Sequence, residues 1–250
     1  MKIIAIASSY RKNGVGSKIL DVISDRLHNY SLKLEIIYLS DFKIEFCRGC
    51  KICYKKGEEF CPLKDDVSIL RNKMLNSDGV IFLTPTYVIS MSGNMKTLLD
   101  RISYYCHRGQ FTGKFSLVIS NTAAGGEKMV LTPLAYAVMS MGFKITDKKG
   151  FKIPFDVISA YQKREIEVIV DKFYNTIKKG VVKPDIIEVM SFLMRKQAFS
   201  EQHPDTVFEH NYWKENGLLK KNVNYFNNIQ IPFVKLVLAK ILKKIIYLFF

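Results

Sequence analysis

Short apolar runs alternate along this chain with longer segments in which apolar residues recur every three or four positions. The short runs have the length and composition of buried strands, which we expect at 3–7, 34–39, 79–83, 115–120 and 143–146. The longer segments predict helices near 19–27, 66–76, 94–105, 127–141 and 157–178. Strands that alternate with helices of this length form a parallel sheet covered by helices on both faces.

Five such units within the first 178 residues match the doubly wound strand order 2-1-3-4-5 of flavodoxin-like domains. A (β/α)₈ barrel would need more units. The sequence therefore predicts an α/β fold with a five-stranded parallel sheet over residues 1–180. Beyond a Gly- and Pro-containing boundary at 180–184, we expect residues 181–250 to form a mostly helical C-terminal extension, with helices at 185–198 and 232–248.

Composition narrows the class of protein. Hydrophobic residues make up 48% of the 250 residues and charged residues 24%, which is typical of a globular chain. The formal net charge is +15, but the excess is spread along the chain and forms no basic tail, so we expect no nucleic-acid partner. The apolar run at 3–7 is shorter than a signal-peptide core, and no run is long enough to span a bilayer. We therefore expect a cytoplasmic protein.

The loop after the first strand is the first candidate site, because ligands of such sheets bind at the carboxyl ends of the strands. It reads Ser8-Ser-Tyr-Arg-Lys-Asn-Gly-Val-Gly-Ser17. Hydroxyls, glycine N–H groups and a helix N-terminus suit a terminal phosphate, and Arg11 adds a planar fork for phosphate oxygens. The P-loop pattern and the third glycine of the dinucleotide fingerprint are both absent. The alternative is a plain strand-to-helix loop with a serine cap.

Two later loops strengthen the ligand interpretation. Residues 84–101 contain Thr-Pro-Thr-Tyr-Val, and residues 120–126 read Ser-Asn-Thr-Ala-Ala-Gly-Gly. With the first loop, they resemble the NAD(P)H-dependent FMN reductase and iron-sulfur flavoprotein group of the flavodoxin-like superfamily. The resemblance covers about residues 1–178 and is specific only as a set of three loops.

The resemblance implies which residues hold FMN. The family's first loop, roughly Gly-Ser-Pro-Arg-Lys-Asn-Gly-Asn-Thr-Ser, binds the phosphate, and here the corresponding residues are Ser9, Arg11, Asn13, Gly16 and Ser17. The chain departs from it where Val15 and Gly16 replace Asn-Thr, which removes two side-chain donors and leaves backbone N–H groups. By the same resemblance, the second loop runs along the isoalloxazine ring and the third approaches its pyrimidine edge. These two loops contribute Pro85, Thr86, Tyr87, Val88, Asn121, Thr122, Gly125 and Gly126.

Four of the five cysteines lie close together in the sequence, at Cys47, Cys50, Cys53 and Cys61. The spacing Cys-x₂-Cys-x₂-Cys-x₇-Cys lets three thiolates converge within one loop, and a fourth can complete a four-cysteine site. In the iron-sulfur flavoprotein branch, a similar motif carries a [4Fe-4S] cluster. Bare reduced thiols or a redox pair, and a zinc site, stay open as alternatives. We interpret Cys106 as a buried side chain, and His107 and Arg108 as a surface turn.

These observations predict an FMN-dependent oxidoreductase that transfers electrons between NAD(P)H, or a redox partner, and a small-molecule acceptor. Flavin chemistry requires the protein to hold the isoalloxazine ring and to adjust its reduction potential, so we assign no catalytic side chain. One alternative is an electron-transfer protein without its own substrate. Another is a flavodoxin-like binding module held at a membrane.

The segment 232–248 predicts an amphipathic helix whose lysines fall on one half and whose apolar residues fall on the other. An apolar face this large is unusual on a soluble monomer. We therefore expect it to be buried against the core or a second subunit in a homo-oligomer, with peripheral contact to an anionic membrane as the alternative.

Overall fold

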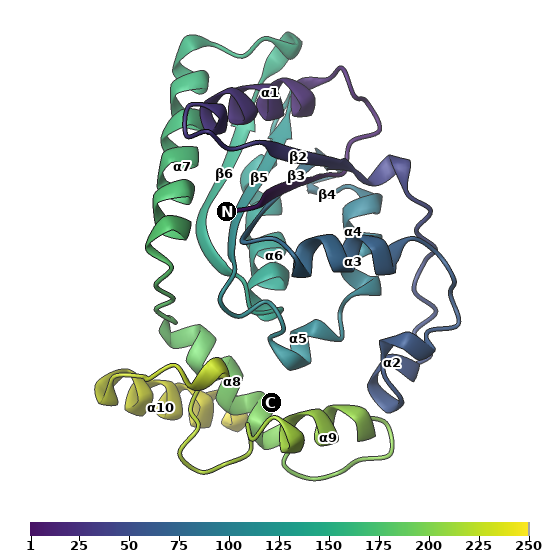
Figure 1. Cartoon of the computed structure of the whole chain (residues 1–250), viewed down its shortest axis with the longest axis vertical. Coiled ribbons are helices and arrows are strands. Elements are labelled where there is room, and N and C mark those ends of the chain that lie inside the picture. The colour runs from purple at the N-terminus through teal and green to yellow at the C-terminus, as the bar shows by residue number, and fades with distance from the viewer. Residues whose placement is uncertain (250) are drawn as a thin grey trace.

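The computed structural model describes residues 1–249, apart from the side chains of Tyr247 and Phe249. Five parallel strands form the central sheet in the order β2-β1-β3-β5-β6, which is the expected doubly wound order 2-1-3-4-5 (Figure 1). A short additional strand, β4 (Ser90–Met91), folds back antiparallel on β3. The bounds of the parallel strands are Ile3–Ala7 (β1), Leu34–Tyr38 (β2), Gly79–Tyr87 (β3), Phe115–Thr122 (β5) and Lys144–Lys152 (β6).

Helices cover both faces of the sheet because successive strand residues point to opposite sides. Ile3 and Ala5 pack toward α1 (Val15–His28) and α7 (Ala160–Lys179). Ile4 and Ile6 pack toward the opposite face, where α3 (Val67–Leu75), α4 (Gly93–Arg101) and α6 (Glu127–Ser140) lie (Figure 1). Both faces of the sheet are therefore buried, which explains why the strands are continuous apolar runs rather than alternating apolar and polar residues.

Two elements differ from their predicted bounds. The helix expected at 94–105 is two helices, since α4 ends at Arg101 and a short helix α5 follows at Tyr105–Arg108. Gly109, directly after α5, has a φ of 57°. A Cβ at Gly109 would come within 2.3 Å of the Phe226 ring, so the turn accepts only glycine. The last strand continues to Lys152 instead of 146. It lies at the sheet edge, where the charged residues that obscure its pattern are tolerated.

Residues beyond α7 form three helices, α8 (Ile186–Ala198), α9 (Val207–Glu215) and α10 (Phe233–Phe249). They share a hydrophobic cluster centred on Phe192, Trp213 and Phe226. Helix α9, which the sequence analysis did not predict, lies against α5 and α2 (Ile52–Lys55) (Figure 1). Four short 3₁₀ turns complete the secondary structure of residues 1–249, at Leu39–Asp41, Glu58–Phe60, Pro154–Asp156 and Phe226–Asn228.

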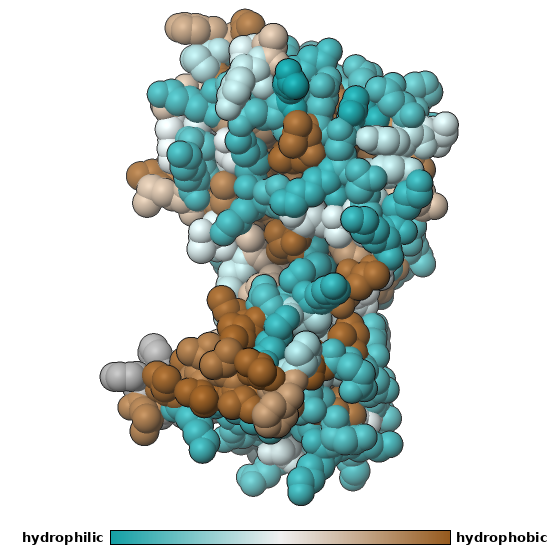
Figure 2. All heavy atoms as spheres, turned by 90° about the vertical axis from the view of Figure 1, so that its left-hand side faces the viewer, coloured by the Kyte–Doolittle hydropathy of each residue, from teal (hydrophilic) through white to brown (hydrophobic). Residues whose placement is uncertain are grey.

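Helix α10 packs on α8 with the half that carries Leu236 and Ala239, and its apolar half faces solvent (Figure 2). The expectation that the core of the same chain covers this apolar half is therefore wrong. The second subunit of the expected homo-oligomer stays a prediction. Across the described residues 1–249, no helix combines the length and apolar character needed to cross a membrane.

Candidate functional site

Three loops meet at the carboxyl edge of the sheet because their strands are neighbours there. Strand β3 lies between β1 and β5. The backbone N–H of Ser8, directly after β1, donates to the carbonyl of Leu83 in β3 over 3.0 Å. On the other side of β3, Pro85 is paired with Asn121 of β5. The structure thus brings the three predicted FMN loops to one place. Whether FMN binds them stays a prediction.

In the first loop, Gly14 occupies the N-cap position of α1 and provides no side-chain cap. The N–H groups of the first helical turn are therefore left for an external acceptor, which is the usual basis of phosphate binding at helix ends. Gly16 and Ser17 are buried in this turn, and the Ser17 hydroxyl donates to the Gly14 carbonyl over 2.7 Å. Arg11 and Asn13 are exposed. Ser9 Oγ accepts from the Arg11 N–H over 3.1 Å.

The second loop is a two-residue hairpin turn between β3 and β4. Val88 and Ile89 occupy its centre with φ values of 49° and 60°. For a β-branched residue, this left-handed backbone conformation costs about 1–2 kcal/mol relative to a right-handed or extended conformation. Both side chains are exposed, Val88 to 98%, and Tyr87 is 53% exposed. The turn therefore presents a strained backbone and three large side chains to solvent beside the other two loops.

The third loop lies against this hairpin. Gly126 has a φ of 86°, and a Cβ there would lie 3.6 Å from Ile89 Cγ1. A Cβ on Gly125 would have no neighbour within 4 Å, so this part of the loop borders open space. Thr122 Oγ1 accepts from the N–H groups of Ala124 and Gly125 over 3.2 and 3.3 Å, so hydrogen bonds within the loop hold its conformation.

Two polar atoms at this edge are buried without a hydrogen-bond partner among the described residues. They are Thr86 Oγ1 and Asn121 Oδ1. A buried polar group without a partner costs about 1–3 kcal/mol, so such atoms are uncommon unless a ligand or solvent completes them. Both belong to residues that the sequence analysis assigned to the isoalloxazine ring. The edge therefore offers unmatched polar atoms to a polar, planar group.

Three hydroxyls that the sequence analysis did not assign tie the loops together. Ser92 Oγ lies 2.7 Å from Ser8 Oγ, and the Ser92 N–H donates to Thr84 Oγ1 over 3.0 Å. Ser92 also caps α4 by accepting from the Met95 N–H. A serine directly before a helical pattern is a recognised N-cap signal, so the sequence contained a clue to this residue.

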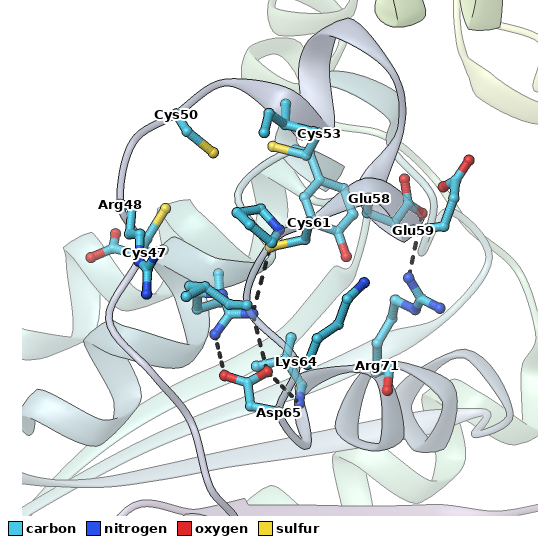
Figure 3. A pocket seen from close by; sticks show the side chains of 18 of the residues that line it. Cys47, Arg48, Cys50, Cys53, Glu58, Glu59, Cys61, Lys64, Asp65 and Arg71 are labelled. Atoms are coloured by element: carbon cyan, nitrogen blue, oxygen red, sulfur yellow. Dashed lines mark hydrogen bonds and ion pairs between the residues drawn. The ribbon is translucent and has the colours of Figure 1, made fainter.

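The four clustered cysteines line one cavity of about 350 Å³, and their sulfur atoms point into it from the loop and from α2 (Figure 3). All are free thiols; Cys47 and Cys50 are exposed, and Cys53 and Cys61 are half-buried. Within the part of the chain that the structure describes, no set of three or more Cys, His, Asp or Glu groups is arranged closely enough to hold a metal ion. The four predicted donor thiols thus line one cavity, but they lie farther apart than the ligands of a bound metal ion.

A buried ion pair fixes one side of this cavity. The Arg101 guanidinium binds both carboxylate oxygens of Asp65, and the side chains are only 4% and 1% exposed. Burial by itself would raise the pKa of Asp65, but hydrogen bonds from Arg101 and from the Glu45 N–H outweigh it and hold the pKa below its ordinary value. Arg101 Nη2 also lies 3.8 Å from Cys61 Sγ, so a fixed positive charge faces this thiol.

Arg108 fixes the other side, and its predicted place in a surface turn is wrong. Its side chain is 3% exposed and binds the fully buried carboxylate of Glu209 in α9, with 3.0 Å between Nη2 and Oε1. It also pairs with Glu58 and donates to the Cys53 carbonyl over 2.9 Å. Burial raises the pKa of the Cys53 thiol to about 11 despite the nearby guanidinium. No local pattern reveals Arg108, because its partners lie 50 and 101 residues away.

Helix α4 connects the two regions. It begins beside Ser92 at the loop edge and ends at Arg101 in the wall of the cysteine cavity. Nine helical residues span about 13 Å. The cysteine cavity and the loop edge are therefore neighbouring parts of one side of the sheet.

Comparison with known proteins agrees with this arrangement. An iron-sulfur flavoprotein of Archaeoglobus fulgidus is 38% identical over 115 residues, which cover 46% of this chain and 51% of that protein. The chain thus spans about half the length of this relative. An iron-sulfur flavoprotein of Clostridioides difficile (strain 630) is 27% identical over 232 residues, which cover 88% of this chain and 100% of that protein.

Among solved structures, a flavone reductase superposes with a TM-score of 0.60 at 18% identity, over 71% of this chain and 63% of that one. At this identity, the likeness concerns the fold alone. The family model described as NADPH-dependent FMN reductase matches residues 1–147, which contain all three loops and the four clustered cysteines. With its strand order and its loops in the expected places, the chain belongs to the NADPH-dependent FMN reductase family.

Proposed function

We propose that this chain is an FMN-dependent oxidoreductase that passes electrons from NADPH, NADH or a redox partner to a small acceptor. The observation that carries the proposal is the loop edge, where Thr86 Oγ1 and Asn121 Oδ1 are buried without partners beside an uncapped helix N-terminus. An amide oxygen without a donor suits the ring N–H of a flavin, and the helix end suits its phosphate. The family membership supports the same cofactor.

FMN bound at this edge would supply the acceptance and release of a hydride or of electrons. The chain's own residues have simpler tasks. Arg11 and the first turn of α1 would bind the phosphate, and the backbone of 85–88 would lie along the ring. The hairpin centred on Val88 is exposed, so one side of the edge remains open to a donor or an acceptor.

We further propose that Cys47, Cys50, Cys53 and Cys61 hold a [4Fe-4S] cluster. The donor set fits, because four free thiols face one cavity and no disulfide joins them (Figure 3). Cationic side chains, among them Arg48, Lys51 and Arg101, line the same cavity and would offset the negative charge of four thiolates. Closure of the loop that carries Cys47 and Cys50 would draw the thiols together. Bare thiols and zinc are the competing outcomes.

Purification without oxygen, followed by absorption spectroscopy and metal analysis, tests both cofactors. We expect a flavin band near 450 nm and about four irons per chain. Serine at Cys50 should remove the iron, whereas serine at Cys106, outside the cavity, should leave it bound. Iron near zero after anaerobic reconstitution would leave bare thiols, and one zinc per chain would identify a zinc site.

A second candidate function is electron transfer without a substrate of its own. The exposed Cys47 and Cys50 favour it, because a centre held there would lie within reach of a partner protein. Steady-state oxidation of NADPH and NADH with quinone, nitroaromatic or free flavin acceptors separates the two functions. Turnover with any of these acceptors supports the reductase. Reduction of the bound cofactor without turnover supports the electron carrier.

A further inference from the structure

Helix α10 turns its apolar half away from the rest of the chain. The half that contacts α8 includes Leu236 and the fully buried Ala239. On the opposite half, large apolar side chains are 37–82% exposed, and they gather into one patch in the lower part of Figure 2. They include Phe233, Val237, Ile241, Ile245 and Leu248. An apolar face of this extent marks an interaction surface rather than scattered exposed residues.

Lysines border this face along its length. At about 100° per residue, Lys240 and Lys244 lie along one edge of the apolar half and Lys235 lies along the other. Lys240 and Lys244 are exposed, whereas Lys235 Nζ donates to the Pro184 carbonyl over 2.6 Å. The helix thus presents an apolar stripe with a cationic rim.

The charge of the surrounding chain distinguishes between two kinds of occupant. Residues 216–250 contain six lysines and no acidic residue. A second copy docked face to face would bring two such cationic rims together, which is unfavourable. An anionic surface would instead place opposite charge beside the exposed Lys240 and Lys244.

A groove at the end of the helix fits the same interpretation. Gln197 of α8 and Lys243, Lys244 and Leu248 of α10 line a groove of about 460 Å³. It places ammonium and amide groups directly beside apolar surface. A phospholipid presents the matching combination, an anionic headgroup next to acyl chains.

We propose that α10 docks this protein on an anionic lipid bilayer. The helix lies along the membrane plane, its apolar half enters the boundary between headgroups and acyl chains, and the exposed Lys240 and Lys244 contact the headgroups. Its 17 residues give a contact about 25 Å long.

Co-sedimentation of the full chain with vesicles tests the proposal. We expect binding to phosphatidylcholine vesicles that contain phosphatidylglycerol, much weaker binding to pure phosphatidylcholine, and weaker binding as salt is added. Glutamate at both Val237 and Ile241 should reduce the partition coefficient at least about tenfold. Glutamine at both Lys240 and Lys244 should reduce it about fivefold for each lysine.

Matched variants on α7 and just beyond it serve as controls. Glutamate at the exposed Val168 and Val181, and glutamine at the exposed Lys163 and Lys179, should leave vesicle binding unchanged. Circular dichroism confirms that each variant is folded. Absence of binding to anionic vesicles overturns the proposal, as does equal binding to neutral ones. A lipid-free dimer that Val237→Glu with Ile241→Glu converts to a monomer, without vesicle binding, would assign the face to a second copy.

Discussion

The loop edge of the sheet and the cysteine loop are two candidate redox regions that the fold positions in different ways. At the loop edge, paired strands place the residues, and Pro85 and Asn121 are partners in the ladder itself. Between residues 47 and 66, the chain forms only one four-residue helix and one 3₁₀ turn. There, buried ion pairs made by Arg101 and Arg108 hold the backbone. The first region therefore depends on backbone hydrogen bonds, and the second on charges contributed by distant elements.

Replacement of Arg108 by methionine should have the largest effect. It leaves Glu209 fully buried without its cation, and loss of one partner of a buried pair costs about 3–5 kcal/mol. Urea unfolding measures the loss, and FMN affinity of the folded fraction should stay unchanged because Arg108 lies outside the loop edge. Arg164→Met, at an exposed position on α7, should change the unfolding free energy by less than about 0.5 kcal/mol. A loss below about 1 kcal/mol for Arg108→Met would show that the pair does not hold the loop.

Asp65→Asn should destabilise the fold by about 1.5–3 kcal/mol at pH 7, the contribution of a hydrogen bond to a charged group. Because the folded-state pKa of Asp65 is below its unfolded value, this contribution is fully present above about pH 4. It disappears as the pH falls through the folded-state pKa. The difference in unfolding free energy between the two proteins, measured at pH 7, 5 and 3, should therefore be largest at pH 7 and smaller at pH 3.

Asp100→Asn is the control for this second experiment. Asp100 forms an exposed ion pair with Lys96 on α4, so its replacement should change the free energy of unfolding only slightly. A difference between wild type and Asp65→Asn that is independent of pH would contradict the role assigned to the carboxylate.

Arg11→Ala tests the loop edge itself. It should weaken FMN binding by about 1.5–3 kcal/mol while leaving the free energy of unfolding of the FMN-free chain nearly unchanged, since Arg11 is exposed. Fluorescence titration with FMN gives the affinity, and Arg164→Ala provides a charge-matched control. Unaltered affinity would remove Arg11 from the phosphate site.

The smallest effect is expected at the hairpin turn. Val88→Asn with Ile89→Gly relieves the left-handed strain at both positions. Because the glycine loses more backbone entropy on folding and asparagine keeps part of the strain, the net stabilisation should be about 1–2 kcal/mol. Alanine at both positions removes the side chains but keeps most of the strain, so it should give little gain. If the alanine pair stabilised the chain as much as Asn-Gly, the strain would not be the cause.

Sequence alone determined the sheet, its strand order and the three loops at its edge. These features follow from local periodicity and from the rule that parallel strands end at one edge, so no long-range contact had to be known. The cysteine spacing likewise predicted that four thiols share one loop, and they line one cavity. Only the tertiary structure showed that Thr86 Oγ1 and Asn121 Oδ1 are buried without partners, because burial depends on everything packed around them.

The tertiary structure also decided the places of Arg108 and α10. Arg108 is the last residue of the short helix α5 and resembles a surface residue in sequence, yet Glu58 and Glu209 reach it from remote elements. The amphipathic pattern of α10 predicted a helix with one apolar half but not the direction in which that half points. Periodicity defines a face relative to the helix axis, whereas packing against α8 selects which face is covered. In this chain, the contact with α8 leaves the apolar half to solvent.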